Sequence, residues 1–176
     1  LVDAKIRERM RRELRKMQRD LGVTMVFVTH DQLEALMLSD RIAIMREGKL
    51  IQIGTPQEIY DNPVNLFVAS FIGSPTMNFL EGVLRVFEDK LILESDVKID
   101  LMRGVDTRPY NLLDGKKVII GFRPEDAFIS PEGLIKGVVQ HTEIAGDRKI
   151  IHVKVSDKCS IRVFVDLYAL IGIGDV

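Results

Sequence analysis

The longest uninterrupted apolar stretch near the start of the chain runs over residues 25–28 and stops at Thr29 and His30. A short apolar run with β-branched members that ends abruptly in polar residues is typical of a strand buried on both faces. We therefore expect a buried strand at residues 25–28. His30 would then lie just beyond the carboxyl end of that strand.

A helix is predicted directly after this strand, over residues 31–38. Its apolar side chains recur at helical spacing, at Leu33, Leu36 and Met37. Two capping boxes are possible, either Thr29 with Gln32 or Asp31 with Glu34. Both place His30 where a strand meets a helix. Ligands bind at this edge of open α/β sheets, and a helix N-terminus favours anions. A lone histidine there is either an ordinary structural residue or a functional group, and the junction does not decide between the two.

The clearest helix is predicted over residues 3–21. One apolar stripe follows the spacing of a helix, at Ile6, Met10, Leu14, Met17 and Leu21. Asp3 can cap the start of the helix, and Gly22 can end it in the left-handed conformation. The other faces are rich in lysine and arginine, which suits either a nucleic-acid surface or a solvated helix face. Since no aromatic residue is available there to stack on bases, the solvated face is favoured.

A tight hairpin is predicted next. Two short strands, at residues 41–46 and 49–53, flank Glu47 and Gly48. A two-residue turn that ends in glycine suits such a hairpin.

Two short helices are expected after the hairpin. Thr55, Pro56 and Glu58 form a capping box with proline in the first turn, and this helix must end before Pro63. Pro63 is expected to open a second helix that closes at Gly73. The side chains that this second helix should bury are Leu66, Phe67 and Phe71.

The pattern changes near Ser74, where alternating helices and strands give way to short strands and turns. Strands are predicted at residues 80–87, 90–94, 116–122, 133–143, 149–156 and 160–165. Residues 145–147 and 157–158 are expected to form hairpin turns. Many short strands at near-regular spacing predict a small sandwich or barrel. We therefore expect an α/β domain over residues 1–75 and an all-β domain over residues 76–176.

Composition narrows the classes of function. The chain has 176 residues and a formal net charge of -1, so its overall charge does not favour nucleic acid or a membrane surface. The single cysteine, Cys159, excludes an internal disulfide and fits a reducing compartment. No apolar run is long enough to span a bilayer. Because the chain opens on Leu1 without an initiator methionine, we expect it to be a fragment.

Several segments, in this order, resemble an ATPase subunit of the ABC transporters. They are residues 1–5 (the end of the D-loop), 28–35 (the switch or H-loop), 41–54 (the closing hairpin), 55–60 and 71–78 (the sugar-importer branch typified by the maltose transporter), and 121–126 (the Gly-x-Arg-Pro-Glu signature of its regulatory domain). Asp126 departs from the histidine that this branch usually has at that position. It lies in a regulatory or structural loop, so no catalytic assignment depends on it.

The resemblance implies an α/β fold, the C-terminal part of an ABC ATPase domain, followed by an all-β OB-type (TOBE) barrel. It implies that His30 contacts the γ-phosphate of ATP and holds the attacking water, while Asp3 is the D-loop residue that communicates across a dimer. It further implies use of ATP and magnesium, a homodimer through both domains, transmembrane permease partners and a possible regulatory protein on the barrel. No nucleic-acid partner is expected, and the location would be cytoplasmic, on the inner face of the membrane. Without the resemblance, Asp3 is equally a simple helix cap.

Other motifs of such ATPases are absent from the sequence. The 176 residues hold no Gly-x-x-x-x-Gly-Lys-Ser/Thr phosphate loop, no Gln-loop, no Leu-Ser-Gly-Gly-Gln signature, and no magnesium-binding Asp with an adjacent catalytic Glu. The chain by itself is therefore expected to be inactive, to bind no metal and to lack the last strand of its barrel. Its uncovered apolar strand should promote association. The alternative is a stand-alone OB-type module that binds an effector or an oligonucleotide without catalysis.

Overall fold

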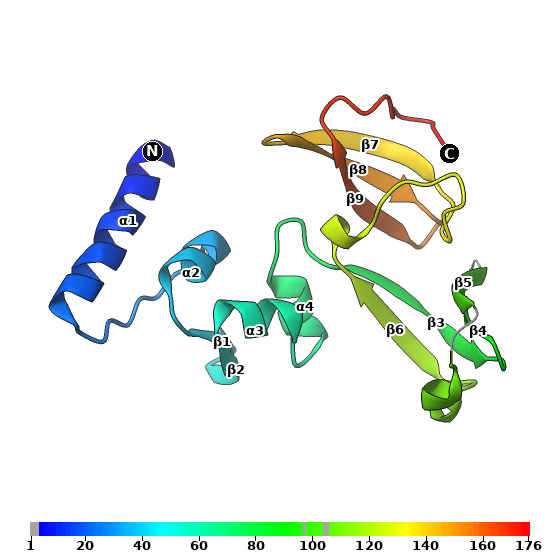
Figure 1. The fold of residues 1–176 in the computed structure, drawn as a ribbon, viewed down its shortest axis with the longest axis horizontal. Coiled ribbons are helices and arrows are strands. Elements are labelled where there is room, and N and C mark those ends of the chain that lie inside the picture. Colours follow the sequence, from blue (N-terminus) through cyan, green and yellow to red (C-terminus); the bar gives the residue numbers. More distant parts are fainter. Residues whose placement is uncertain (1–3, 97, 104–105) are drawn as a thin grey trace. The chain divides into compact units, whose positions relative to one another are not determined.

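The computed structural model describes residues 4–96, 98–103 and 106–176, and it divides into two compact units (Figure 1). The first unit covers residues 1–74 and the second covers residues 75–176. Each unit has a hydrophobic core of its own.

The first unit alternates helices with one hairpin. Its elements are α1 (Ala4–Leu21), α2 (Gln32–Leu38), β1 (Ile42–Arg46), β2 (Lys49–Gly54), α3 (Pro56–Asp61) and α4 (Leu66–Phe71). As predicted, Gly22 ends α1 in the left-handed conformation, with φ of 62°. No helix in the described part of the chain is both long and apolar enough to cross a membrane.

The predicted hairpin is present. β1 and β2 pair antiparallel, with Arg46 opposite Lys49. Glu47 and Gly48 form the turn with φ of 51° and 75°. Positive φ at both central residues matches the twist of the two strands, and it explains why glycine follows glutamate here.

The core of the first unit lies between the hairpin and the short helices. Its buried members are Ile42, Ile44, Ile59, Val68 and Ile72. The capping box of α3 forms as predicted, because Glu58 N donates to Thr55 Oγ1 (3.2 Å) and Thr55 N donates to Glu58 Oε2 (2.8 Å).

The prediction for the next helix is wrong in its start and in its buried face. Helix α4 begins after Asn65, whose side chain accepts a hydrogen bond from Val68 N, and not at Pro63. It buries Val68 and Ala69, whereas Leu66 and Phe71 are exposed. Of the three side chains predicted to be buried, only Phe67 packs against the core, and it is partly buried. The asparagine cap fixes where the helix begins, and that start sets which face meets the core.

The prediction of a buried strand at residues 25–28 is also wrong for this chain. Residues 23–29 form no strand, and Val26 and Val28 are 86% and 91% exposed. A strand is completed by the hydrogen bonds of a neighbouring strand. In the described part of the chain, no strand pairs with this segment.

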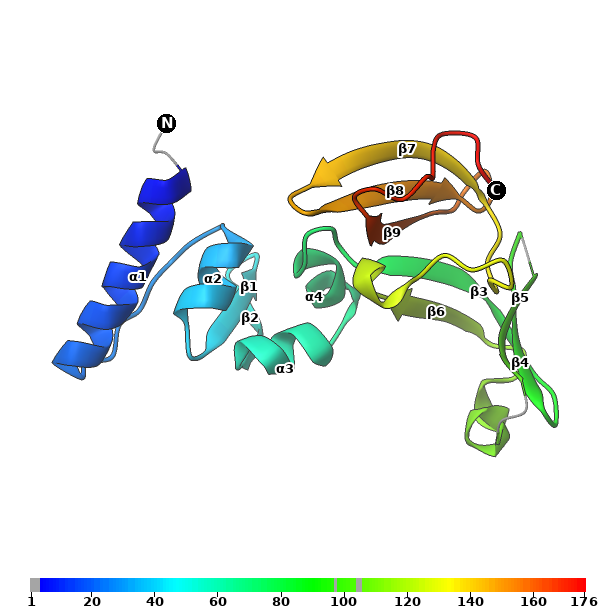
Figure 2. The same ribbon diagram turned by 45° about the horizontal axis from the view of Figure 1, so that its top comes forward.

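The second unit is built from two antiparallel sheets (Figure 2). Its strands are β3 (Asn78–Val86), β4 (Lys90–Glu94), β5 (Lys98–Arg103), β6 (Lys117–Phe122), β7 (Val138–Ala145), β8 (Arg148–Lys154) and β9 (Ser160–Asp166). The spatial order is β5-β4-β3-β6 in one sheet and β7-β8-β9 in the other. Two 3-10 turns, η1 (Arg108–Leu113) and η2 (Pro124–Asp126), flank β6.

The two sheets share one core. Leu80, Leu93 and Ile99 from the first sheet and Val139, Ile151, Val153, Ile161 and Val163 from the second form a single buried cluster. Buried and partly exposed residues alternate along most of β8 and β9. This layout suits the OB-type barrel expected from the sequence.

Two strands differ from their predictions. β5 was not predicted, although Ile99 and Leu101 point to the core at alternate positions. β7 begins only at Val138, because residues 133–137 form turns rather than a ladder. Near the end of the chain, Gly174 N donates to the carbonyl of Val139 (2.9 Å), and Val139 N donates to the carbonyl of Asp175 (2.9 Å).

Candidate functional site

His30 lies in the short connection that leads into α2. It is exposed, and within the described residues its ring makes no hydrogen bond or ion pair. The imidazole is therefore presented to solvent with both nitrogens available. A group in this state can bind or orient a ligand without first breaking an internal contact.

The backbone on both sides of His30 is held by side chains. Asp31 caps α2, and its Oδ1 accepts from Leu33 N (2.9 Å) and Glu34 N (3.2 Å). Thr29 Oγ1 accepts from Asp31 N (2.9 Å) and donates to Glu34 Oε2 (2.8 Å). The second of the two predicted caps is thus the one present, although Glu34 bonds Thr29 rather than the backbone of Asp31.

This cap changes what the N-terminus of α2 can do. The expectation was that the helix start would favour an anion, but Leu33 N and Glu34 N already bond the carboxylate of Asp31. These two backbone N–H groups are therefore already occupied and are not available to a further anion. The group left to meet a ligand at this junction is the imidazole of His30.

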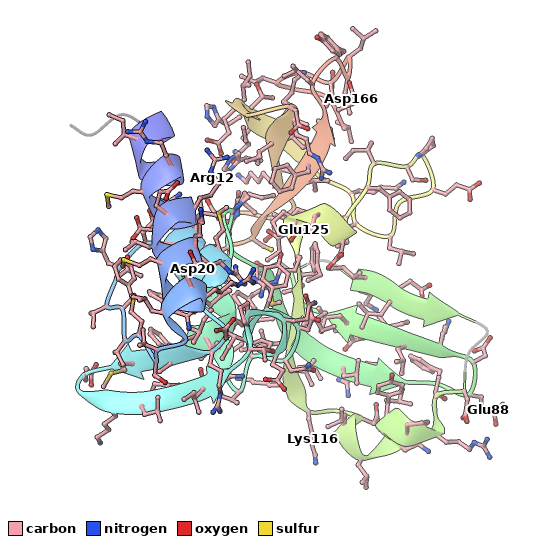
Figure 3. All side chains as sticks on the ribbon, turned by 60° about the vertical axis from the view of Figure 1, so that its left-hand side comes forward. Arg12, Asp20, Glu88, Lys116, Glu125 and Asp166 are labelled. Atoms are coloured by element: carbon pink, nitrogen blue, oxygen red, sulfur yellow. The ribbon has the colours of Figure 1, made fainter. Side chains whose placement is uncertain are left out.

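Helix α1 contributes a buried cation to the same network. Arg11 Nη2 lies 3.1 Å from Asp31 Oδ2 and 3.2 Å from Glu34 Oε1, and its side chain is only 15% exposed. No pattern in the sequence predicts this contact, because the basic residues of α1 as a group favour a solvated face. Figure 3 labels Arg12 and Asp20 among the other charged residues of that helix.

The other site residue predicted from the sequence is Asp3. Asp3 lies outside the described residues, so its assigned role in dimer communication stays a prediction. His141 and His152, the other histidines of the chain, face each other across β7 and β8 in the second unit, with ring centroids 5.4 Å apart. His152 Nε2 lies 2.7 Å from Glu143 Oε1, and this contact lowers the pKa of the Glu143 carboxyl.

The Gly-x-Arg-Pro-Glu segment lies where β6 ends. Arg123 and Pro124 are buried, whereas Glu125, labelled in Figure 3, is exposed on η2. η2 contacts β9, so the segment joins the two sheets of the second unit. Asp126 is exposed on the same turn, in keeping with a structural role for this loop.

A magnesium ion would need several oxygen ligands, such as carboxylates, close together. Across the ranges that the structure describes, no group of three or more His, Cys, Asp or Glu side chains could hold a metal ion. Asp31 and Glu34 already share the guanidinium of Arg11. The described residues therefore do not fit a magnesium ion.

Comparison with known proteins identifies relatives for nearly the whole chain. Residues 73–127 match the family described as the MalK OB fold domain. The trehalose/maltose import ATP-binding protein MalK of Thermococcus litoralis is 43% identical over 167 residues, covering 88% of this chain and 43% of the relative. The sn-glycerol-3-phosphate import ATP-binding protein UgpC of Vibrio vulnificus is 39% identical over 172 residues, covering 96% of this chain and 44% of the relative.

The chain is similar over most of its length to the MalK and UgpC import ATP-binding proteins. It spans less than half the length of the curated relatives it matches. The resemblance drawn from the sequence and the predicted fold class are thereby confirmed, with an OB-type domain following an α/β portion. These relatives support the importer ATPase interpretation and not the stand-alone binding module.

Proposed function

We propose that the whole protein is the ATP-hydrolysing subunit of an ABC importer that takes up a sugar or a related solute, and that His30 is its γ-phosphate contact. The observation that carries this proposal is the state of His30, whose ring is unbonded within the described residues while Thr29 and Asp31 fix the backbone beside it. The relatives, which are named as import ATP-binding proteins, supply the chemical context.

Phosphoryl transfer needs positioning and charge stabilisation more than covalent chemistry. In this proposal His30 donates one ring N–H to a γ-phosphate oxygen and holds the attacking water in line. A neutral imidazole can do this, because one of its nitrogens is a donor and the other an acceptor. Thr29 and Asp31 hold the backbone from which the ring projects, and this reduces the ordering required in the transition state.

The rest of the nucleotide site would come from other motifs. The phosphate loop, signature motif and magnesium-binding residues of such ATPases are absent from these 176 residues. Magnesium, when bound, would neutralise phosphate charge. Asp3 is proposed to act across the dimer interface.

The proposed function also implies partners and a location for the whole protein. We propose a homodimer formed through the ATPase and C-terminal domains, transmembrane permease subunits, and a regulatory protein that acts on the OB-type domain. The protein would lie at the cytoplasmic face of the membrane. The relatives' roles in import support a permease partner.

The proposal is tested by His30→Ala in the full-length protein. The expected result is a severe loss of ATP turnover with nucleotide affinity mostly retained, since one hydrogen bond is removed from a site held by many. Normal turnover in this variant would remove His30 from the site. The 176-residue chain by itself is expected to hydrolyse no ATP above background.

A further inference from the structure

One guanidinium connects α1 to both sides of the His30 connection. Nη2 of Arg11 contacts Asp31 Oδ2 at 3.1 Å and Glu34 Oε1 at 3.2 Å. Asp31 follows His30 directly, and Glu34 in turn accepts a hydrogen bond from Thr29, which directly precedes it. Arg11 therefore contacts Asp31 directly and reaches Thr29 through Glu34, although it is distant from His30 in the sequence.

The three side chains that meet at Arg11 are mostly withdrawn from water. Side-chain exposure is 15% for Arg11, 20% for Glu34 and 31% for Asp31. Two carboxylates this close would repel each other without a cation between them. Hydrogen bonds between ionised groups are short and directional, so the guanidinium fixes the orientation of both carboxylates as well as their charge.

The arrangement is poorly explained as a device for stability alone. Arg11 Nε is buried and has no hydrogen-bond partner in the described part of the chain, which costs free energy. Buried ion pairs generally add little net stability, because desolvation offsets the attraction. The contacts instead determine geometry. Asp31 caps α2, and the backbone N–H of Asp31 donates a hydrogen bond to Thr29 Oγ1.

We propose that Arg11 is a positioning residue for His30. By holding Asp31 directly and Thr29 through Glu34, it fixes the backbone from which the imidazole projects. The orientation of the ring toward a bound γ-phosphate then depends on α1. This inference rests on the proposed function of His30, and it adds a residue that does not itself touch the nucleotide.

The same helix carries a matched control. Arg15, one turn further along α1, donates to the carbonyl of Met37 and lies 3.9 Å from Asp40 Oδ1. It therefore ties α1 to the other end of α2, beyond the His30 connection. Loss of Arg15 removes a cation between the same two helices without touching Thr29, Asp31 or Glu34.

The test measures kcat and KM for ATP in full-length Arg11→Met, Arg11→Lys, Arg15→Met, His30→Ala and the Arg11→Met/His30→Ala double variant. We expect Arg11→Met to lower kcat by roughly 10- to 100-fold, the scale of a misplaced catalytic group, with KM near the wild-type value. Arg11→Lys should recover most of kcat, because an ammonium can donate to both carboxylates. Arg15→Met should leave kcat unchanged. The double variant should be no slower than His30→Ala, because Arg11 acts through His30.

Several results would overturn the inference. One is a wild-type kcat in folded Arg11→Met. Another is a fall in kcat in Arg15→Met equal to that in Arg11→Met. The third is a double variant whose kcat is much lower than that of His30→Ala. If His30→Ala itself turns over normally, the proposed function fails. If His30→Ala is slow but folded Arg11→Met turns over normally, the proposed function stands and only the role of Arg11 is overturned. Should Arg11→Met not fold, Glu34→Gln takes its place, since it keeps an acceptor for Thr29 but weakens the bond to Arg11. A fall in its kcat is expected, and wild-type kcat would contradict the inference.

Discussion

At the scale of single residues, Asn78 shows how the two sheets of the second unit are joined. Its side chain is 2% exposed, and its amide meets the main chain of Arg162 on β9 twice. Nδ2 donates to the Arg162 carbonyl (2.8 Å), and Oδ1 accepts from Arg162 N (2.8 Å). The amide thus pairs with β9 as a neighbouring strand would. Few other side chains offer a donor and an acceptor in this geometry.

Asn78→Ala should therefore destabilise the second unit by about 1–3 kcal/mol for each backbone group left unsatisfied. Asn78→Asp should lose at least as much, because it keeps the acceptor for Arg162 N but places a carboxylate oxygen against the Arg162 carbonyl at a buried position. Chemical denaturation followed by circular dichroism measures the change, with exposed Asn111→Ala as the matched control. Equal stability of Asn78→Ala and Asn111→Ala would contradict this account.

At the scale of elements, the parts that the sequence predicted correctly depend on neighbours along the chain. The β1–β2 turn follows from Glu47 and Gly48, and the start of α3 follows from Thr55 and Glu58. The strand at residues 25–28 was wrong because strand pairing needs a distant partner.

Two features, strand β5 and the contacts of Arg11, were not predicted, for different reasons. β5 could have been found, because Ile99 and Leu101 alternate with polar residues. The role of Arg11 could not, since many basic residues lie on α1 and only the packing of two helices shows which one is buried. For the candidate site, the sequence singled out His30, whose role stays a prediction, but not the side chains that hold its connection.

The capping box of α3 predicts a pH dependence. Hydrogen bonds from Thr55, first from its backbone N–H and then from its hydroxyl, lower the pKa of Glu58. The unfolded chain then binds the proton more readily. The stabilisation is therefore complete above the unfolded pKa of about 4.3 and is lost as pH falls through the folded pKa.

Thermal unfolding of the wild type and of Glu58→Gln across this range measures the effect. The wild type should be the more stable above about pH 4.3, with the difference shrinking below it. A difference that stays constant with pH would show that the charge of Glu58 plays no part in the cap.

At the scale of the whole molecule, the first unit exposes an apolar segment. Val26, Phe27 and Val28 are all exposed beside the connection to His30. Apolar surface of this kind promotes association. We expect the 176-residue chain to form dimers or larger species at micromolar concentration, measured by light scattering. Val26→Lys together with Val28→Lys should reduce this association, whereas a monomeric wild-type chain would contradict the expectation.

The central claim is that His30 acts on the γ-phosphate during hydrolysis. The most direct test is the single-turnover rate of ATP hydrolysis by the full-length protein, with enzyme in excess over nucleotide, compared between wild type and His30→Ala. Binding is saturated in this experiment, so only the chemical step is measured. The account predicts a rate at least about 100-fold lower in His30→Ala, comparable to removal of an electrostatic contact in other active sites. A rate equal to that of the wild type would contradict it.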